Sequence, residues 1–209
     1  MEGRAKTIES RKNRKIKISI IPGHFATNHS HINNYIDMTK IKTSHKMAKD
    51  AAEQIAASYS STPIDTIICM EGTEMLGAFL AESLASGGIN RDEDISVITP
   101  ELNSNNQMIF RDNIQKMIWG KSVLLLISSV STGKTINRAI ECLNYYSGEL
   151  VAIASIFSAI TESNGIAVHS VFTPDDITGY QTYVHSECPM CKAGQKVDAI
   201  VNSFGYSKI

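Results

Sequence analysis

Short apolar runs alternate with helical stripes along the chain. Three of these runs are continuously apolar, as parallel strands covered on both faces are: residues 65–70 (DTIICM), 123–127 (VLLLI) and 150–157 (LVAIASIF). Residues 15–21 (KIKISII) instead alternate between polar and apolar positions, which predicts a half-exposed edge strand.

Three segments between these runs carry apolar residues at helical spacing. The first stripe follows Ser44, a candidate N-cap, and contains Met47, Ala51, Ile55 and Tyr59. The other two stripes consist of Leu76, Phe79, Leu80 and Leu84, and of Ile136, Ala139, Ile140 and Leu143. This alternation predicts an α/β fold with a mostly parallel central sheet flanked by helices.

Length and charge narrow the class of protein. With 209 residues, 43% of them hydrophobic, and a net charge of -1, residues 1–209 are expected to form a single domain that is not a general nucleic-acid binder. The first seventeen residues are locally basic; we interpret them as a solvated tail, with a nucleic-acid-binding arm as the alternative. No apolar stretch approaches the roughly 20 residues that span a bilayer, and no apolar signal core is present, so we expect a cytoplasmic protein.

Residues 123–135 (VLLLISSVSTGKT) have the composition of a phosphate-binding loop after a strand. A Walker A motif would need glycine at position 128, which is serine here. The hydroxyls of Ser131, Thr132 and Thr135, with Gly133 and a helix N-terminus, instead suit a single phosphate group. The alternative is that Ser131 or Thr132 only caps the helix.

This loop resembles the ribose-phosphate loop of type I phosphoribosyltransferases, in which four apolar residues, two acids and two apolar residues precede Ser/Thr-Thr-Gly-x-Ser/Thr. Residues 29–37 (HSHINNYID) resemble the base-covering segment of the orotate enzymes. Residues 70–84 take the place of the pyrophosphate loop and its helix. Residues 185–194 (HSECPMCKAG) look like the Cys-Pro-Leu-Cys-x-x-Gly ending of several bacterial members.

The resemblance implies the type I phosphoribosyltransferase fold, with a core over about residues 40–175 and a small hood from residues 16–39 and 176–209. It also implies Mg²⁺ bound with phosphoribosyl pyrophosphate, and a homodimer that contributes lid residues across its interface. The substrate-binding residues that it implies are Ser128, Ser129, Ser131, Thr132, Gly133, Lys134, Thr135, Glu71, Gly72, Thr73, Phe25 and Tyr35.

The chain departs from the family at the two loop acids, which are Ile127 and Ser128 here. Serine brings no charge to a ribose or a metal-bound diphosphate, and isoleucine brings no polar atom. Glu71 and Glu74 follow a neighbouring strand, so we hypothesise that they supply the missing metal-organising charge.

A second departure concerns the lid. Residues 99–121 have the location of the flexible loop that closes over the diphosphate, but they offer Arg111 and Lys116 in place of the usual Lys-x-x-Lys-x-His spacing. We expect these two cations to be the catalytic groups that stabilise the leaving diphosphate. The alternative is that both lie on a solvated helix face.

Cysteine and histidine residues suggest a further site near the C-terminus. Cys188, Cys191 and His185 have the spacing of three zinc ligands, with His169 as a candidate fourth, and free thiols are the alternative to structural Zn²⁺. His24, His29 and His31 precede Tyr35; they are expected either to line the base pocket with Phe25 or to pack as an ordinary loop.

Taken together, the motifs favour an enzyme: an orotate phosphoribosyltransferase-like transferase of pyrimidine biosynthesis. It would transfer phosphoribose from phosphoribosyl pyrophosphate to a nitrogen base and release diphosphate. The altered loop and lid keep an alternative open, in which a non-catalytic sensor or regulator retains the fold and the pocket. A P-loop nucleotide hydrolase is the weakest interpretation, because the first glycine of its motif is missing.

Overall fold

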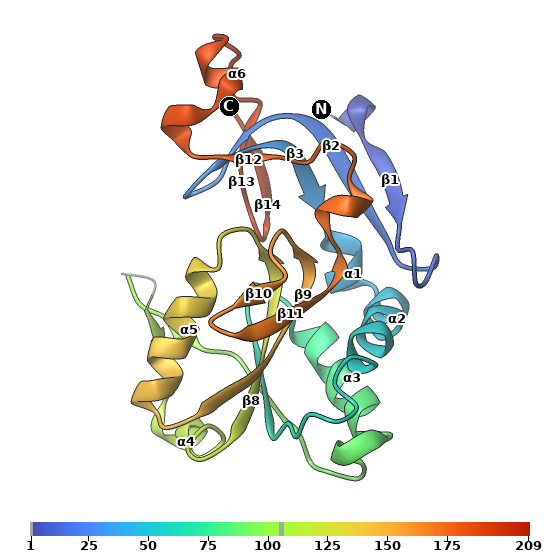
Figure 1. Ribbon diagram of the computed structural model, residues 1–209, viewed down its shortest axis with the longest axis vertical. Helices are drawn as coiled ribbons and strands as arrows, with labels where there is room; N and C mark the ends of the chain where they lie inside the picture. The colour runs from blue at the N-terminus through green and yellow to red at the C-terminus, as the bar shows by residue number, and fades with distance from the viewer. Residues whose placement is uncertain (1, 105–106) are drawn as a thin grey trace.

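A six-stranded, mostly parallel sheet forms the core of the computed structural model, which describes residues 2–104 and 107–209 (Figure 1). Its strands lie in the order β10 (Glu162–Ser163), β11 (Ile166–Phe172), β9 (Glu149–Ser158), β8 (Ser122–Val130), β4 (Thr66–Cys69) and β5 (Ser96–Ile98). All neighbouring strands are parallel except β10, which runs antiparallel to β11. The predicted α/β fold with a mostly parallel sheet is therefore confirmed.

Helices cover both faces of the core sheet. The helices α2 (His45–Ala56) and α3 (Glu74–Ala85) pack on one face, and α5 (Lys134–Tyr145) packs on the other. Side chains of β8 alternate accordingly: Leu124 and Leu126 belong to the apolar cluster beneath α2 and α3, whereas Leu125 and Ile127 belong to the cluster beneath α5. The second and third predicted stripes thus lie on helices that bury them against the sheet, as do Met47, Ala51 and Ile55 of the first. Tyr59, the last residue of the first stripe, lies beyond the end of α2 but is buried in the same cluster.

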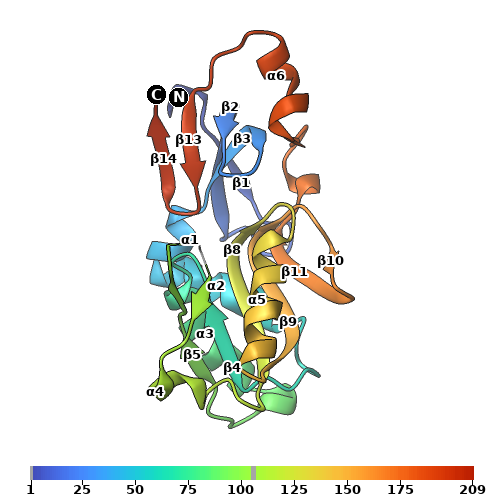
Figure 2. The same ribbon diagram turned by 90° about the vertical axis from the view of Figure 1, so that its left-hand side faces the viewer.

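A second sheet forms a hood over one end of the core (Figures 1 and 2). Its strands lie in the order β12 (Thr182–Tyr183), β3 (His31–Asp37), β2 (Lys17–Ala26), β13 (Ala199–Asn202) and β14 (Gly205–Lys208), and β1 (Lys6–Glu9) also pairs with β2. Both views show the two chain ends side by side at the outer end of this hood.

Two expectations for the N-terminal segment were wrong. The alternating strand is not at an edge, because β2 pairs with β3, β13 and β1. The basic segment is not wholly a solvated tail, because its residues Lys6–Glu9 form β1. The strand β1 was not predicted because its side chains are largely exposed and show no apolar alternation. The interior position of β2 was not predicted because its partner β13 comes from the other end of the chain.

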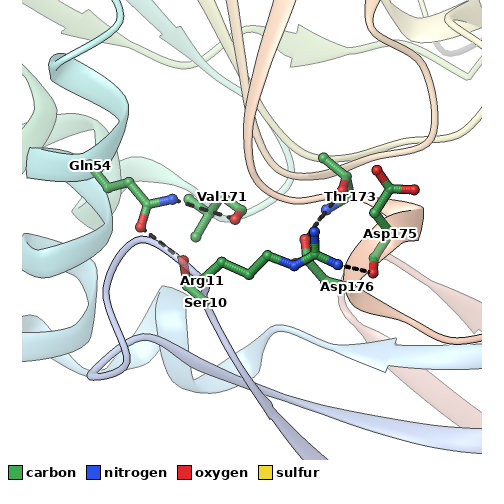
Figure 3. A network of polar contacts seen from close by, with 7 residues as sticks. All are labelled: Ser10, Arg11, Gln54, Val171, Thr173, Asp175 and Asp176. Carbon is green, nitrogen blue, oxygen red and sulfur yellow. Dashed lines mark hydrogen bonds and ion pairs between the residues drawn. The ribbon is translucent and has the colours of Figure 1, made fainter.

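Hood and core share one apolar cluster and one polar network. Ile18 and Ile20 of the hood belong to the same buried cluster as Leu124 of the core. In the turn after β1, Ser10 donates a hydrogen bond to Gln54 of α2 (3.0 Å), and Arg11 forms an ion pair with Asp176 (2.9 Å) just beyond β11 (Figure 3). These contacts hold the β1–β2 turn against both a core helix and the segment after a core strand.

The remaining elements are short. A hairpin of β6 (Glu101–Leu102) and β7 (Met108–Ile109) leads into α4 (Asp112–Gln115), while α1 (Thr39–Thr43) joins hood to core and α6 (Pro189–Lys192) lies on the hood. Single 3₁₀ turns occur at Glu2–Arg4, Gly88–Asn90, Pro174–Asp176 and His185–Glu187. Among the described residues, no helix has the length and apolar character needed to cross a bilayer.

Candidate active site

A cleft of about 330 Å³ lies between the hood and the carboxyl ends of the core strands. The hood contributes Thr27, Asn28, His29, Ser30, Ile32, Tyr35, Ile36, Met38, Tyr180, Val201, Asn202, Ser203 and Phe204. The core contributes Met70, Glu71, Leu102, Met108, Ser129, Val130, Ser131, Thr135, Arg138 and Phe157. A larger cavity, of about 530 Å³ along α2 and α3, is lined by none of the predicted site residues.

The predicted phosphate loop joins the end of β8 to the start of α5. Gly133 is the N-cap of α5 and has φ +74°, a left-handed conformation that favours glycine. No side chain caps this helix, so the interpretation of Ser131 or Thr132 as a simple helix cap is wrong. The first-turn amides and the positive end of the helix dipole therefore remain available to an anion.

The loop residues divide into two groups. Ser129, Ser131 and Thr135 line the cleft, whereas Thr132 and Lys134 are exposed beside it. A Cβ added at Gly133 would stand 3.4 Å from side-chain atoms of Ile160 and Ser163, which is ordinary contact, so the positive φ and not lack of space is what favours glycine here. The loop thus presents hydroxyls and backbone amides on the cleft side.

Glu71 provides a carboxylate next to the position where the loop acids are missing. The Ser128 hydroxyl is fully buried and donates a hydrogen bond of 2.6 Å to Oε2 of Glu71. Ile127 belongs to the apolar cluster beneath α5, so its side chain faces away from the cleft. The Glu71 carboxylate, from the turn after β4, therefore reaches the end of β8. Glu74, the other acid named in the hypothesis, is exposed at the start of α3 and is not part of the cleft lining.

The backbone around Glu71 is strained and is held in place by a hydrogen bond from Lys42. Glu71 has φ +63° and Gly72 has φ +79°, both in the left-handed region. The Lys42 ammonium donates hydrogen bonds to the backbone oxygens of Glu71 (3.1 Å) and Ser203 (2.5 Å), which connects the core turn with the hood. Desolvation raises the pKa of the Glu71 carboxyl, although the Ser128 hydrogen bond and the Lys42 charge oppose the shift.

Seven of the twelve predicted binding residues are not part of the cleft lining: Ser128, Thr132, Gly133 and Lys134 of the loop, and Gly72, Thr73 and Phe25. Thr73 is fully buried, and its hydroxyl donates to the Met70 carbonyl at 2.9 Å, so it stabilises the end of β4. Gly72 supplies the turn conformation beside Glu71. Phe25 is fully buried in the hood, with its ring 6.0 Å from that of Tyr35.

Tyr35 does line the cleft, and desolvation raises the pKa of its hydroxyl to about 12. The Tyr35 phenol therefore stays protonated and can donate a hydrogen bond at neutral pH.

Of the three histidines considered for the base pocket, His29 alone is part of the cleft lining.

The predicted lid cations do not face the cleft of their own chain. Arg111 is exposed and forms two hydrogen bonds with the Glu101 carboxylate, at 2.6 and 2.8 Å, and Lys116 is also exposed. Of the described residues of the preceding hairpin, Leu102 and Met108 line the cleft. A role for Arg111 or Lys116 in this cleft would therefore require movement of the segment that carries them.

Sequence reasoning missed several cleft residues. Arg138 lies three residues after Thr135 on α5, so the i, i+3 helical spacing was a usable signal for it. Lys42 contacts the site through two backbone oxygens and lies over the Phe204 ring, 5.6 Å from its centroid. Phe204 reaches the cleft because β13 and β14 return to the hood. No local pattern marks these two residues.

The C-terminal cysteines meet a different pair of histidines from the predicted one. Among the described residues, His24, His31, Cys188 and Cys191 place their ligand atoms within 4.8 Å of one another. His185 lies outside this group, with its ring edge-on to that of His31 at 4.9 Å. His169 makes an edge-to-face contact with Tyr59, with ring centroids 5.2 Å apart. Spacing along the chain favoured His185, whereas the fold of the β2–β3 hairpin brings the other two.

Comparison with solved structures identifies the architecture. The orotate phosphoribosyltransferase of Mycobacterium tuberculosis H37Rv superposes with a TM-score of 0.54 over 77% of this chain and 93% of that one, at 14% identity. A phosphoribosyltransferase from Corynebacterium diphtheriae superposes with a TM-score of 0.52 over 76% and 90%, also at 14% identity. The chain has the type I phosphoribosyltransferase fold.

Sequence comparison points to the orotate branch of this fold. An orotate phosphoribosyltransferase from Thermoanaerobacter sp. (strain X514) is 26% identical over 181 residues, which cover 85% of this chain and 88% of that protein. One from Chlorobium phaeobacteroides is 23% identical over 187 residues, covering 87% and 88%. No family model matches the chain. The resemblance drawn from the loop, the base-covering segment and the tail is confirmed.

Proposed function

We propose that the chain is a phosphoribosyltransferase of the orotate type, transferring phosphoribose from phosphoribosyl pyrophosphate to a nitrogen base with release of diphosphate. One observation carries the proposal: the Glu71 carboxylate is hydrogen-bonded to Ser128, beside a loop whose helix has no side-chain cap. The site thus keeps a negative group for a hydroxylated, metal-bearing substrate and free donors for its phosphate.

The 5-phosphate would bind at the loop before α5. Ser131 and Thr135 offer hydroxyls on the cleft side, Gly133 allows close approach of the backbone, and Lys134 adds a positive charge nearby. Backbone amides at the start of a helix hold phosphate well because they point along the dipole toward the anion. Arg138, one turn further, adds a cation at the cleft wall.

The donor set near Glu71 fits Mg²⁺, because a carboxylate and neighbouring hydroxyls are the hard oxygen groups that this ion accepts together with retained waters. When bound with the substrate, Mg²⁺ neutralises charge on the diphosphate. Glu71 and Ser128 would hold the ribose and metal side of the substrate, and Lys42 would keep the turn in place from beneath.

The chemistry breaks the bond between the anomeric carbon and the diphosphate oxygen, which leaves with the electron pair, while a nitrogen of the base supplies the pair for the new bond. No side chain has to act as a nucleophile. The chain contributes by positioning the two reactants and by stabilising the charge that develops on the leaving group. The base would lie against the hood, where Ile32 and Tyr35 line the cleft.

Assembly would complete the site. We propose a homodimer in which Arg111 or Lys116 closes over the diphosphate in the partner's cleft, since neither residue lines the cleft of its own chain. Negative charge develops on the diphosphate as it departs. A cation that interacts with this charge in the transition state lowers the barrier, whereas a cation that binds the ground state and the transition state equally does not.

Calorimetric titration with phosphoribosyl pyrophosphate, with and without Mg²⁺, tests the proposal. We expect Mg²⁺-dependent binding that is abolished by Thr135→Val, which removes a hydroxyl of the cleft lining, and by Gly133→Val, but kept by Thr7→Val, an exposed threonine of β1. Addition of orotate should then release diphosphate. Absence of binding under both conditions, or binding that never leads to diphosphate release with any base, would rule out the transferase.

A further inference from the structure

Four metal-ligating side chains converge in the hood, from segments far apart along the chain. His24 comes from β2, His31 from the start of β3, Cys188 directly precedes α6, and Cys191 lies within it. His24 and Cys188 are fully buried, and His31 is 7% exposed. None of the four lines the substrate cleft.

The separations of the ligand atoms match a small tetrahedral site. Nε2 of His24 lies 3.6 Å from Sγ of Cys188 and 3.5 Å from Sγ of Cys191, and Nδ1 of His31 lies 3.2 Å from Sγ of Cys191. Tetrahedral Zn²⁺, with Zn–S near 2.3 Å and Zn–N near 2.0–2.1 Å, separates nitrogen from sulfur by about 3.5 Å. The two histidine nitrogens, 2.8 Å apart, need to separate by only about 0.5 Å to reach the tetrahedral spacing.

A bulge in β2 aims His24 at the cluster. The β2–β3 register shifts between Pro22 and Phe25, so Gly23 and His24 oppose the single residue Asn33. The Asp198 carboxylate accepts a hydrogen bond from the His24 amide at 2.9 Å, and a Cβ at Gly23 would stand 2.4 Å from the same carboxylate. Glycine at position 23 therefore permits the contact that fixes the bulge.

The orientation of the His24 ring is also fixed. Its Nδ1 lies 2.9 Å from the backbone oxygen of Gln195, which can only accept, so Nδ1 carries the proton. The lone pair of Nε2 then points at Cys188 and Cys191. Zinc-bound histidines commonly donate their other ring nitrogen to a carbonyl or carboxylate in this way, which sets tautomer and direction together.

We propose that His24, His31, Cys188 and Cys191 bind one structural Zn²⁺. Four protein ligands leave no open coordination position, which distinguishes such a site from a catalytic one. The ion would fasten the C-terminal segment to the β2–β3 hairpin, whose turn at residues 27–30 lines the cleft. Zinc would thereby hold the base-covering part of the hood in place without taking part in the transfer reaction.

Metal analysis of the purified protein tests the site directly. After saturation with Zn²⁺ and removal of excess, we expect one zinc per chain, and substitution by Co²⁺ should give the visible spectrum of a tetrahedral ion with thiolate ligands. Cys191→Ser and His31→Gln should each weaken zinc binding, measured by competition with a chromophoric chelator, by more than about 100-fold, beyond what loss of a supporting partner costs.

Two matched variants control for general damage. His185→Gln changes a histidine whose ring contacts that of His31, and Cys142→Ser changes a half-buried thiol of α5, so both should retain one zinc per chain. Thiol titration of the wild-type protein gives a second measurement, with Cys188 and Cys191 protected until a chelator is added. A protein without tetrahedral Co²⁺ bands, or one in which Cys188 and Cys191 form a disulfide in the presence of Zn²⁺, would overturn the proposal.

Discussion

Glu71 combines two features that work against stability. Its backbone is in the left-handed region at φ +63°, and desolvation raises the pKa of its carboxyl. A non-glycine residue in this conformation costs about 1–2 kcal/mol, and burying a carboxylate adds to the cost. Strain of this kind persists where surrounding contacts enforce it, and here Ser128 and Lys42 supply them. We interpret the residue as one kept for binding at the expense of stability.

Replacing Glu71 with glutamine should separate these two roles. The folded-state pKa lies above the ordinary 4.5, so the ionised carboxyl lowers stability as pH rises through that window and the penalty is greatest near neutral pH. We expect Glu71→Gln to be at least as stable as the wild type at neutral pH, with the stability difference shrinking near pH 4.5. Urea unfolding at several pH values measures it.

The same variant should lose Mg²⁺-dependent binding of phosphoribosyl pyrophosphate by at least about tenfold, or about 1.4 kcal/mol. Glu74→Gln is the matched control, because Glu74 is exposed at the start of α3 and does not line the cleft. Equal binding by the wild type and Glu71→Gln would remove Glu71 from the proposed metal-organising role.

At the scale of elements, the junction of β8 and α5 depends on the backbone of one glycine. Gly133 and Gly120 both adopt left-handed conformations, with φ +74° and +67°, but only Gly133 belongs to the predicted phosphate loop. We expect Gly133→Ala and Gly120→Ala each to lower the free energy of unfolding by about 1–2 kcal/mol. Only Gly133→Ala should also weaken phosphoribosyl pyrophosphate binding, by about tenfold or more, because the loop amides turn away.

Chemical denaturation and calorimetry on the same samples measure both effects. No atom of the described residues lies within 4 Å of the Cβ position at Gly120, so that variant reports backbone strain alone. If Gly133→Ala binds as well as Gly120→Ala does, the loop does not hold the phosphate.

Elements with strong local periodicity could be predicted from the sequence, and those made by distant partners could not. The stripes of α2, α3 and α5 and the apolar runs of β4, β8 and β9 each carry their own signal. The hood depends on β13 pairing with β2 from the opposite end of the chain. For the same reason the motif indicated that the loop before α5 belongs to the cleft, whereas no local pattern indicated Phe204 or the histidine partners of Cys188.

Phe25 and His24 show how a single bulge changes side-chain placement. Alternation along β2 breaks between Pro22 and Phe25, and both His24 and Phe25 are buried as a result. A one-residue change of register exchanges the two faces of a strand, and no local pattern in the sequence announced it here. We expected Phe25 to line the base pocket. Its side chain instead lies in the interior of the hood.

On the scale of the whole molecule, hood and core are connected by a shared apolar cluster and by polar contacts. The shared apolar cluster and the Arg11–Asp176 ion pair connect them at one side, and Lys42 connects them at the cleft. We propose that the two sheets belong to one domain. The cleft between them is then a feature of the domain itself, and assembly need supply only the lid.

Mixed dimers would reveal lid residues that act across an interface. The double variant Arg111→Ala/Lys116→Ala and the variant Gly133→Val should each be inactive alone, since one lacks the lid and the other the phosphate loop. Random mixing of their subunits should restore about a quarter of wild-type activity, because half of the dimers would carry one intact site of two.

Co-expression of the two variants with different affinity tags yields the mixed species, and diphosphate release measures its activity. The wild type mixed with Gly133→Val serves as the reference for subunit exchange. Mixed dimers that are no more active than their parents would place Arg111 and Lys116 outside the catalytic machinery or within their own chain.

The hydrogen bond between Glu71 and Ser128 also constrains the order in which such a site can change during evolution. The two side chains meet at 2.6 Å, so an acid at position 128 would face a carboxylate already in place, and the repulsion would force one of them to take up a proton. A chain that acquired an acid at position 128 while Glu71 was in place would therefore be less stable than a chain with an acid at only one of the two positions. We expect an exchange of the acid between positions 71 and 128 to pass through a sequence with a small residue at both.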